Sequence, residues 1–203
     1  MITITNFAHG ARGLRPAWLC EEMGVPYRMA MIPYPVPAEY RSRNPLGQVP
    51  FLEDGETATT ESTAMLIHIA QRCGPTPLFP PAGDPAHLRV LQMTVFSEAT
   101  LGATLNALLV DRFAVPETDR DGALPRMLRG RVEQAVDFAA HLLGNGPFFA
   151  GEQFTIADIA MSTAFLMWCG PLGGKLPTAL AAYQDRATAR LAYARASKAN
   201  GNG

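Results

Sequence analysis

Three side chains in the first third of the chain could hold a charged ligand, with Ser62 and Arg12 suited to an anion and the Glu61 carboxylate to a cation. Glu61 and Ser62 stand where the apolar spacing predicts the start of a helix, and Arg12 lies in a loop before another predicted helix. The first N–H groups of a helix lack intrahelical partners and the helix dipole is positive there, so an anion is favoured. Arginine stays charged at any working pH, so Arg12 supplies a fixed positive charge. Both positions also suit simpler tasks, namely a helix cap at Glu61 and Ser62 and a solvated loop position for Arg12.

A proline at the start of a predicted strand is the next feature. Residues 49–52 read as a short strand, and its second residue, Pro50, has no N–H to donate. Proline within a sheet is confined to edge strands, strand starts and bulges. On these residues alone, Pro50 is expected to begin an edge strand.

The cysteines do not indicate a metal site or a disulfide framework. Cys20, Cys73 and Cys169 are odd in number and widely scattered. They have no metal-ligand spacing. Free thiols and the lack of a secretory signal at the start of the sequence favour a cytoplasmic protein without a bound metal.

The first 74 residues mix strand and helix signals and predict an α/β module. β-Branched residues alternate at the start, a helical pattern follows and stops at Gly24, and alternation returns at residues 27–31. A strand, a helix and a strand in this order predict a right-handed parallel unit. Asp54-Gly55 between residues 49–52 and 57–59 predicts a hairpin, and residues 61–73 have helical spacing. The predicted order is therefore βαβ-ββα.

A proline-rich linker separates this module from a purely helical part. Residues 75–85 contain five prolines, at 75, 77, 80, 81 and 85, which the interior of a helix or strand does not tolerate. The expected domains are residues 1–74, the linker 75–85, and an all-helical bundle over 86–203. Its expected helices cover 86–109, 126–143, 155–168 and 176–197, and the polar tail from Lys198 is expected to fray.

Charge and composition exclude several classes of partner. The formal net charge is −1 and no polybasic run occurs, so no positive field exists to gather nucleic acid or an anionic membrane. No run of about 18 apolar residues predicts a membrane span. Charged residues make up 17% of the chain, which is below the usual quarter and makes self-association plausible.

Three stretches in order resemble the cytosolic glutathione transferase family. They are the opening loop and helix at 10–24, the run Asn-Pro-Leu-Gly-Gln-Val-Pro at 44–50 with Thr-Glu-Ser at 60–62, and Phe-Thr-Ile-Ala-Asp at 154–158. The third is a capping box with Thr155 as N-cap and Asp158 at N3, and it is structural. With the linker, the resemblance covers nearly the whole chain and implies a thioredoxin-like domain followed by a helical domain.

The resemblance also implies how glutathione, the co-substrate, would bind. A cis bond before Pro50 would leave the backbone of Val49 unpaired, so the tripeptide could add there as a short antiparallel strand. Ser62 would take the γ-glutamyl carboxylate and Glu61 the ammonium group. Gln48 would reach the glycine end. Family resemblance further implies a homodimer.

The usual catalytic side chain of the family is absent. The opening resembles the bacterial beta-class pattern Gly-Ala-Cys-Ser-Leu-Ser-Pro, but Arg12 replaces the reactive cysteine, and no Tyr, Ser or Cys occurs between Phe7 and Trp18. An adjacent guanidinium lowers the pKa of an anionic group by roughly 1–3 units, so Arg12 is the candidate for holding the glutathione thiolate. His9 and Asn6 are fallback donors.

The second substrate is expected to be an electrophilic, mostly apolar small molecule. Candidate wall residues, most of which should belong to the core, are Phe7, Tyr34, Phe96, Leu101 and Trp168. Three other activities remain as alternatives: a glutathione or ligand carrier that has lost turnover, a glutathione-dependent lyase, and a dehalogenase. A disulfide reductase is disfavoured because its reactive thiol is missing from the first loop and Cys20 falls inside a helix.

Overall fold

The computed structural model describes residues 1–120 and 122–201. By its contacts the chain divides into two compact units. The first consists of Met1–Phe79 and Thr188–Gly203, and the second of Pro80–Ala187. The sequence pattern assigned the last segment to the helical domain, whereas its contacts group it with the sheet.

A mixed sheet forms the centre of the first unit, with strand order β2-β1-β3-β4. β1 runs parallel to β2, and Ile4 pairs with Met29. β3 runs antiparallel to β1, and the hairpin partner β4 runs antiparallel to β3. This confirms the predicted parallel unit followed by a hairpin. The expectation that Pro50 begins an edge strand is wrong, because β3 lies between β1 and β4. The strands are β1 (Ile2–Asn6), β2 (Tyr27–Met31), β3 (Phe51–Asp54) and β4 (Thr57–Thr59).

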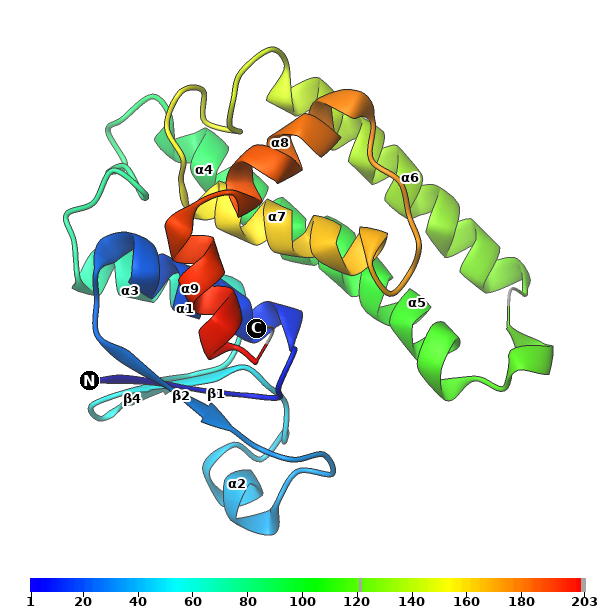
Figure 1. Cartoon of the computed structure of the whole chain (residues 1–203), viewed down its shortest axis with the longest axis horizontal. Coiled ribbons are helices and arrows are strands. Elements are labelled where there is room, and N and C mark those ends of the chain that lie inside the picture. The colour runs from blue at the N-terminus through cyan, green and yellow to red at the C-terminus, as the bar shows by residue number, and fades with distance from the viewer. Residues whose placement is uncertain (121, 202–203) are drawn as a thin grey trace. The chain divides into compact units, whose positions relative to one another are not determined.

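Helices cover the sheet of the first unit. Figure 1 shows α1, α3 and α9 on one side of the sheet and α2 on the other. The buried side chains of α1 and α3 include Leu14, Trp18, Leu66 and Ile69, which form the apolar core against β1 and β3. Gly24 ends α1 in the left-handed region at φ 65°, as the sequence predicted. The helices are α1 (Ala11–Met23), α2 (Ala38–Arg43), α3 (Ser62–Arg72) and α9 (Leu191–Ala199).

Among the described residues of the second unit, the regular elements are helices, as expected. Its long first helix consists of α4, a π-helical segment η1, and α5. α4 packs against α7, and α5 packs against α6. Its elements are α4 (His87–Phe96), η1 (Ser97–Gly102), α5 (Ala103–Ala114), η2 (Glu117–Asp119), α6 (Ala123–Leu143), α7 (Ile156–Cys169) and α8 (Thr178–Thr188).

The predicted single closing helix over 176–197 is wrong. α8 ends at Thr188, and Arg190 has extended backbone at φ −68° and ψ 137° before α9 begins. The guanidinium of Arg190 forms a bidentate ion pair with Glu22 of α1, with N–O distances of 2.6 and 2.7 Å. An Ala- and Arg-rich pattern is compatible with one helix or two, so local spacing does not reveal the break.

The expected fraying of the tail is also wrong for Asn200. This residue is fully buried at 0% exposure. Its side-chain amide donates to the carbonyl oxygen of Gly10 at 3.0 Å. A polar residue near a chain end therefore belongs to the packed interior of the first unit, because its hydrogen bonds are satisfied there.

The capping box at the start of α7 is present as predicted. The carboxylate of Asp158 accepts hydrogen bonds from the Thr155 N–H at 2.8 Å, the Thr155 hydroxyl at 3.0 Å and the Phe149 N–H at 3.0 Å. Burial nevertheless raises the pKa of Asp158 to about 6. These bonds fix the loop before α7 to the helix start.

One helical stretch, His87–Ala114, is long and apolar enough to cross a membrane by length and composition. The stretch is interrupted by polar residues such as Arg89, Glu98 and Asn106, so it is not the unbroken run of about 18 apolar residues that would predict a membrane span from sequence. Val90, Met93, Leu101 and Leu105 of this stretch are buried in the helical unit. A core helix of a helical bundle meets the same criterion, and these side chains pack as such a core.

Candidate functional site

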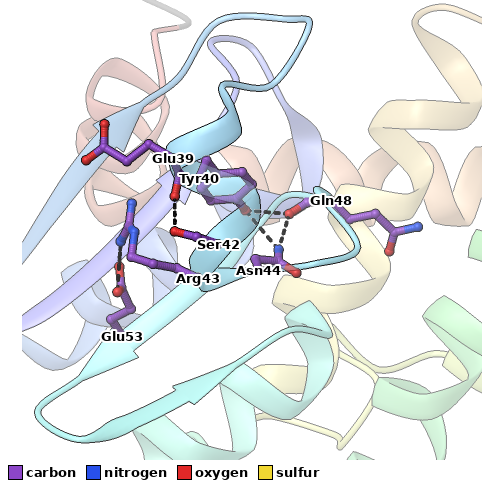
Figure 2. Close-up of polar contacts among 7 residues, drawn as sticks. All are labelled: Glu39, Tyr40, Ser42, Arg43, Asn44, Gln48 and Glu53. Atoms are coloured by element: carbon purple, nitrogen blue, oxygen red, sulfur yellow. Dashed lines mark hydrogen bonds and ion pairs between the residues drawn. The ribbon is translucent and has the colours of Figure 1, made fainter.

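The loop before β3 is held by a small buried network (Figure 2). The Tyr40 hydroxyl and the Asn44 amide both donate to the carbonyl oxygen of Gln48, the amide at 2.7 Å. Tyr40 and Asn44 are 2% and 3% exposed, and burial raises the pKa of Tyr40. The side-chain amide of Gln48 points away from this pair (Figure 2). The network fixes the backbone that leads into Pro50 and leaves the Gln48 side chain exposed.

The residue before Pro50 presents its backbone without a protein partner. The Val49–Pro50 bond is cis, as predicted. Within the described part of the chain, neither the N–H nor the C=O of Val49 forms a hydrogen bond. Val49 is only half-buried. A backbone donor and acceptor are therefore open to an extended peptide at the start of β3.

The start of α3 has an unusual backbone and a buried hydroxyl. Glu61 precedes the helix with φ 66° and ψ 98°, and its own side chain makes no capping hydrogen bond to the described residues. A non-glycine residue at positive φ is uncommon, and such positions cluster at ligand-binding sites. Ser62 is 2% exposed. The simpler task of a side-chain cap is therefore not performed by Glu61.

Arg15 contacts Ser62 and was missed by the sequence reasoning. Its guanidinium donates to the Ser62 hydroxyl at 2.9 Å, although the two residues come from α1 and α3. Arg15 is 0% exposed. Burying a guanidinium costs free energy unless the group is paired or hydrogen-bonded. The sequence signal for such a role was an arginine between Leu14 and Pro16 on the apolar face of α1. The structure thus places a positive charge beside the start of α3.

Arg12 lies in the first turn of α1 and is partly exposed. It stands one helical turn before Arg15, so the opening of α1 carries two guanidinium groups. The sequence placed Arg12 in a loop before the helix, and this is wrong because α1 already begins at Ala11.

The fallback donor Asn6 has a structural task. Its side-chain amide donates to the Gly10 carbonyl at 3.1 Å and to the Asn200 side chain at 2.8 Å. It also lies so close to Gly13 that a Cβ there would come within 2.0 Å of it. His9, the other fallback, is exposed in the loop at φ 64°, and its N–H donates to the Asn200 carbonyl at 3.0 Å. The end of α9 therefore fixes the loop before Arg12.

Cys20 is unsuited to thiol chemistry. It is 0% exposed in α1, and burial raises its pKa to about 12. A thiol with this pKa holds its proton at neutral pH and is a poor nucleophile. This agrees with the expectation that Cys20 is buried.

The predicted wall residues fall into two groups. Phe7 and Tyr34 meet edge to face, with ring centroids 5.9 Å apart, and Tyr34 is 83% exposed. In the second unit, Leu101 and Trp168 are core residues at 1% and 2% exposure. Phe96 is half-buried and packs on Phe138 with centroids 5.9 Å apart. The described residues contain no cluster of three His, Cys, Asp or Glu side chains that could hold a metal ion.

Comparison with known proteins gives the same family for both units. Residues 12–77 match the N-terminal domain of glutathione S-transferases, and residues 103–190 match the C-terminal domain. Glutathione S-transferase 3 of Schizosaccharomyces pombe is 30% identical over 172 residues, which cover 78% of this chain and 71% of the relative.

Solved structures agree with this match. A glutathione transferase from Methylococcus capsulatus is 25% identical with a TM-score of 0.84, and 99% of each chain is covered. A theta-class glutathione S-transferase from Xanthomonas axonopodis pv. citri with glutathione bound is 25% identical with a TM-score of 0.83 and covers 96% of each chain. The chain therefore belongs to the glutathione S-transferase family.

Proposed function

We propose that this chain adds the thiolate of glutathione to an electrophilic, mostly apolar small molecule. The observation that carries the proposal is the open backbone of Val49, beside the cis Pro50. Its N–H and C=O have no hydrogen-bond partner in the described part of the chain. An extended peptide can pair with this open backbone donor and acceptor by main-chain hydrogen bonds.

The start of α3 would receive the γ-glutamyl end of glutathione. The N–H of Ser62 and the helix dipole favour the carboxylate, and the buried Arg15 beside the Ser62 hydroxyl adds a positive charge. The exposed Glu61 carboxylate would pair with the ammonium group. Gln48, whose side chain is exposed, would contact the glycine end.

Arg12 would hold the sulfur in its thiolate form. A thiol with a pKa near 8.5 is mostly protonated at neutral pH. A guanidinium within ~4–6 Å lowers such a pKa by roughly 1–3 units. The dipole at the start of α1 acts in the same direction. This chain would thus use a fixed charge where other members use a hydroxyl or thiol.

Steady-state kinetics with an aromatic halide substrate test this role. We expect Arg12→Ala to lower kcat/KM by at least about tenfold, which corresponds to the loss of about 1.4 kcal/mol of transition-state stabilisation. Arg28→Ala removes the same charge from an exposed position on β2 and should leave the rate unchanged. Equal rates for wild type and Arg12→Ala would contradict the catalytic role of Arg12.

The absence of Tyr, Ser and Cys from the opening loop favours a second candidate, a carrier that binds glutathione without turnover. Calorimetry separates the two functions. Heat on titration with glutathione, together with no conjugate formed by the wild type under any substrate tried, would support the carrier. Absence of binding would contradict both functions.

We also propose a cytoplasmic homodimer that needs no metal and binds neither nucleic acid nor a membrane. The net charge of −1 argues against the polyanionic partners. Large apolar side chains are exposed on the helical unit, among them Leu88, Val95 and Phe138. Such exposed side chains are suited to an interface between copies.

A further inference from the structure

The helical unit contains a cavity of about 480 Å³ whose described lining carries an excess of arginine. It lies among the C-terminal half of α5, the first turns of α6 and the loop after α7. This volume is within the range of small-molecule sites. Its polar lining residues are Asp111, Arg112, Arg120, Arg126 and Arg129, and its apolar ones are Leu108, Pro125, Pro171 and Leu172.

Three of these arginines converge without a carboxylate partner. Neither Arg112, Arg120 nor Arg129 forms an ion pair with any residue that the structure describes. Like charges brought together in one cavity repel, and an anion inside it would relieve that repulsion. The one carboxylate among the described lining residues is Asp111.

Two of the guanidinium groups are held in place by neutral partners. Arg129 donates to the Leu172 carbonyl at 3.1 Å and lies 5.1 Å from the centre of the Trp168 ring. Arg120 donates from Nε to the Val115 carbonyl at 2.8 Å. Each guanidinium has five N–H donors, so most donors of both groups remain available. A positioned guanidinium loses less entropy when it binds an oxyanion.

The loop after α7 is built as a fixed wall of the cavity. The indole N–H of Trp168 donates to the Lys175 carbonyl at 3.1 Å. Gly174 lies against the same ring, where a Cβ would come within 1.9 Å, and Gly173 has φ 63°. The loop is therefore tied to the buried Trp168 on one side and to Arg129 on the other.

We propose that this cavity binds a small organic anion, a carboxylate carried on an apolar or aromatic body. The guanidinium groups match the carboxylate in charge and geometry, and the leucine and proline side chains match the body. This site lies wholly within the helical unit, and it does not depend on the proposed transferase activity.

Isothermal titration with 2-naphthoate and its neutral counterpart 2-naphthamide tests the site. The titrations are made with the full-length protein in excess S-methylglutathione, so that a thiol-peptide site is occupied. We expect the wild type to bind the acid on the order of tenfold more tightly than the amide, because charge-assisted hydrogen bonds form only with the acid. Equal affinities would overturn the proposal.

Matched variants locate the binding. Arg112→Gln, and the double variant with Arg120→Gln, should reduce the preference for the acid to less than about threefold. Arg131→Gln removes the same charge from an exposed position of α6 outside the lining and should retain the wild-type preference. An equal loss in Arg131→Gln, or no loss in Arg112→Gln, would overturn the location. If the double variant does not fold, the single variant Arg112→Gln, at an exposed position, still tests where the anion binds.

Discussion

The contact between Arg15 and Ser62 gives the candidate glutathione site a buried positive charge. Arg15 is fully buried, and its hydrogen bond to the Ser62 hydroxyl measures 2.9 Å. The site thus has two arginines with different surroundings, because Arg12 is partly exposed. We infer separate tasks for them, with Arg15 acting on the carboxylate end of glutathione and Arg12 on the sulfur.

Substitution of Arg15 should weaken glutathione binding more than it changes thiol activation. We expect Arg15→Met to lower the affinity measured by calorimetry by about tenfold or more, since charge-assisted hydrogen bonds contribute about 1.5–3 kcal/mol. The pKa of bound glutathione, measured from thiolate absorbance, should stay as in the wild type. A raised thiol pKa with unchanged affinity would reverse the assignment of the two arginines. Circular dichroism checks that the variant folds.

Cys20 should resist alkylation in the folded protein. Burial raises its pKa to about 12, so at pH 8 the thiol is protonated as well as inaccessible. We expect iodoacetamide to modify Cys73 and Cys169, which are partly exposed, and to modify Cys20 only after unfolding. Peptide mass spectrometry gives the result for each site. Rapid modification of native Cys20 would contradict the burial and restore the reductase alternative.

Among the secondary-structure elements, α9 has the least expected position. Its ion pairs and its terminal Asn200 join it to α1 and to the loop before α1. Arg195 pairs with Glu21 at 2.7 Å, and Asn200 bonds with Asn6 and Gly10. The last helix therefore supports the loop that precedes Arg12.

Removal of the Asn200 side chain should loosen that loop. Asn200→Ala leaves the buried amide of Asn6 with one acceptor fewer, so we expect a loss of about 1–3 kcal/mol in unfolding free energy. Hydrogen exchange in residues 7–13 should accelerate. Asn145→Ala, a change at an exposed position, serves as the control. Unchanged exchange in the loop would show that α9 does not support it.

The start of α7 depends on Asp158 in the same way. Asp158→Ala removes the acceptor of three hydrogen bonds and leaves buried N–H groups without partners. We expect chemical denaturation to show a loss of about 2–4 kcal/mol in the unfolding free energy. Asp137→Ala, on the exposed face of α6, should change it little. A small effect of Asp158→Ala would mean that water or a shifted backbone replaces the carboxylate.

For the whole molecule, the proposed homodimer gives a direct measurement. Light scattering coupled to size-exclusion chromatography should report twice the mass of one chain. Val95→Glu, at an exposed apolar position of α4, should shift the population toward monomer, because a charge in an apolar interface is costly. Leu191→Glu introduces the same charge at an exposed position of α9 and serves as the matched control. A monomeric wild type would contradict the proposal.

Local sequence was sufficient for much of the fold, because many of its signals act over a few residues. The strand–helix–strand opening, the Asp54-Gly55 hairpin, the stop at Gly24 and the capping box at Thr155 and Asp158 depend on turn chemistry, caps and periodicity. These motifs, read together in their order, also gave the family. The short helix α2 (Ala38–Arg43) lay between proline-rich residues and a turn and had no comparable signal.

Contacts between distant segments required the folded chain. Arg15 and Ser62 are 47 residues apart in sequence, and Asn6 and Asn200 are 194 apart, so no local pattern links them. Residues 176–197 divide into two helices because α8 and α9 pack in different units. The helical period of the sequence is the same for one helix as for two, so it does not reveal the break. The arginine-lined cavity likewise brings together segments from α5 to the loop after α7. Periodicity and motifs report local preferences, whereas burial and charge pairing are settled only when separate elements pack together.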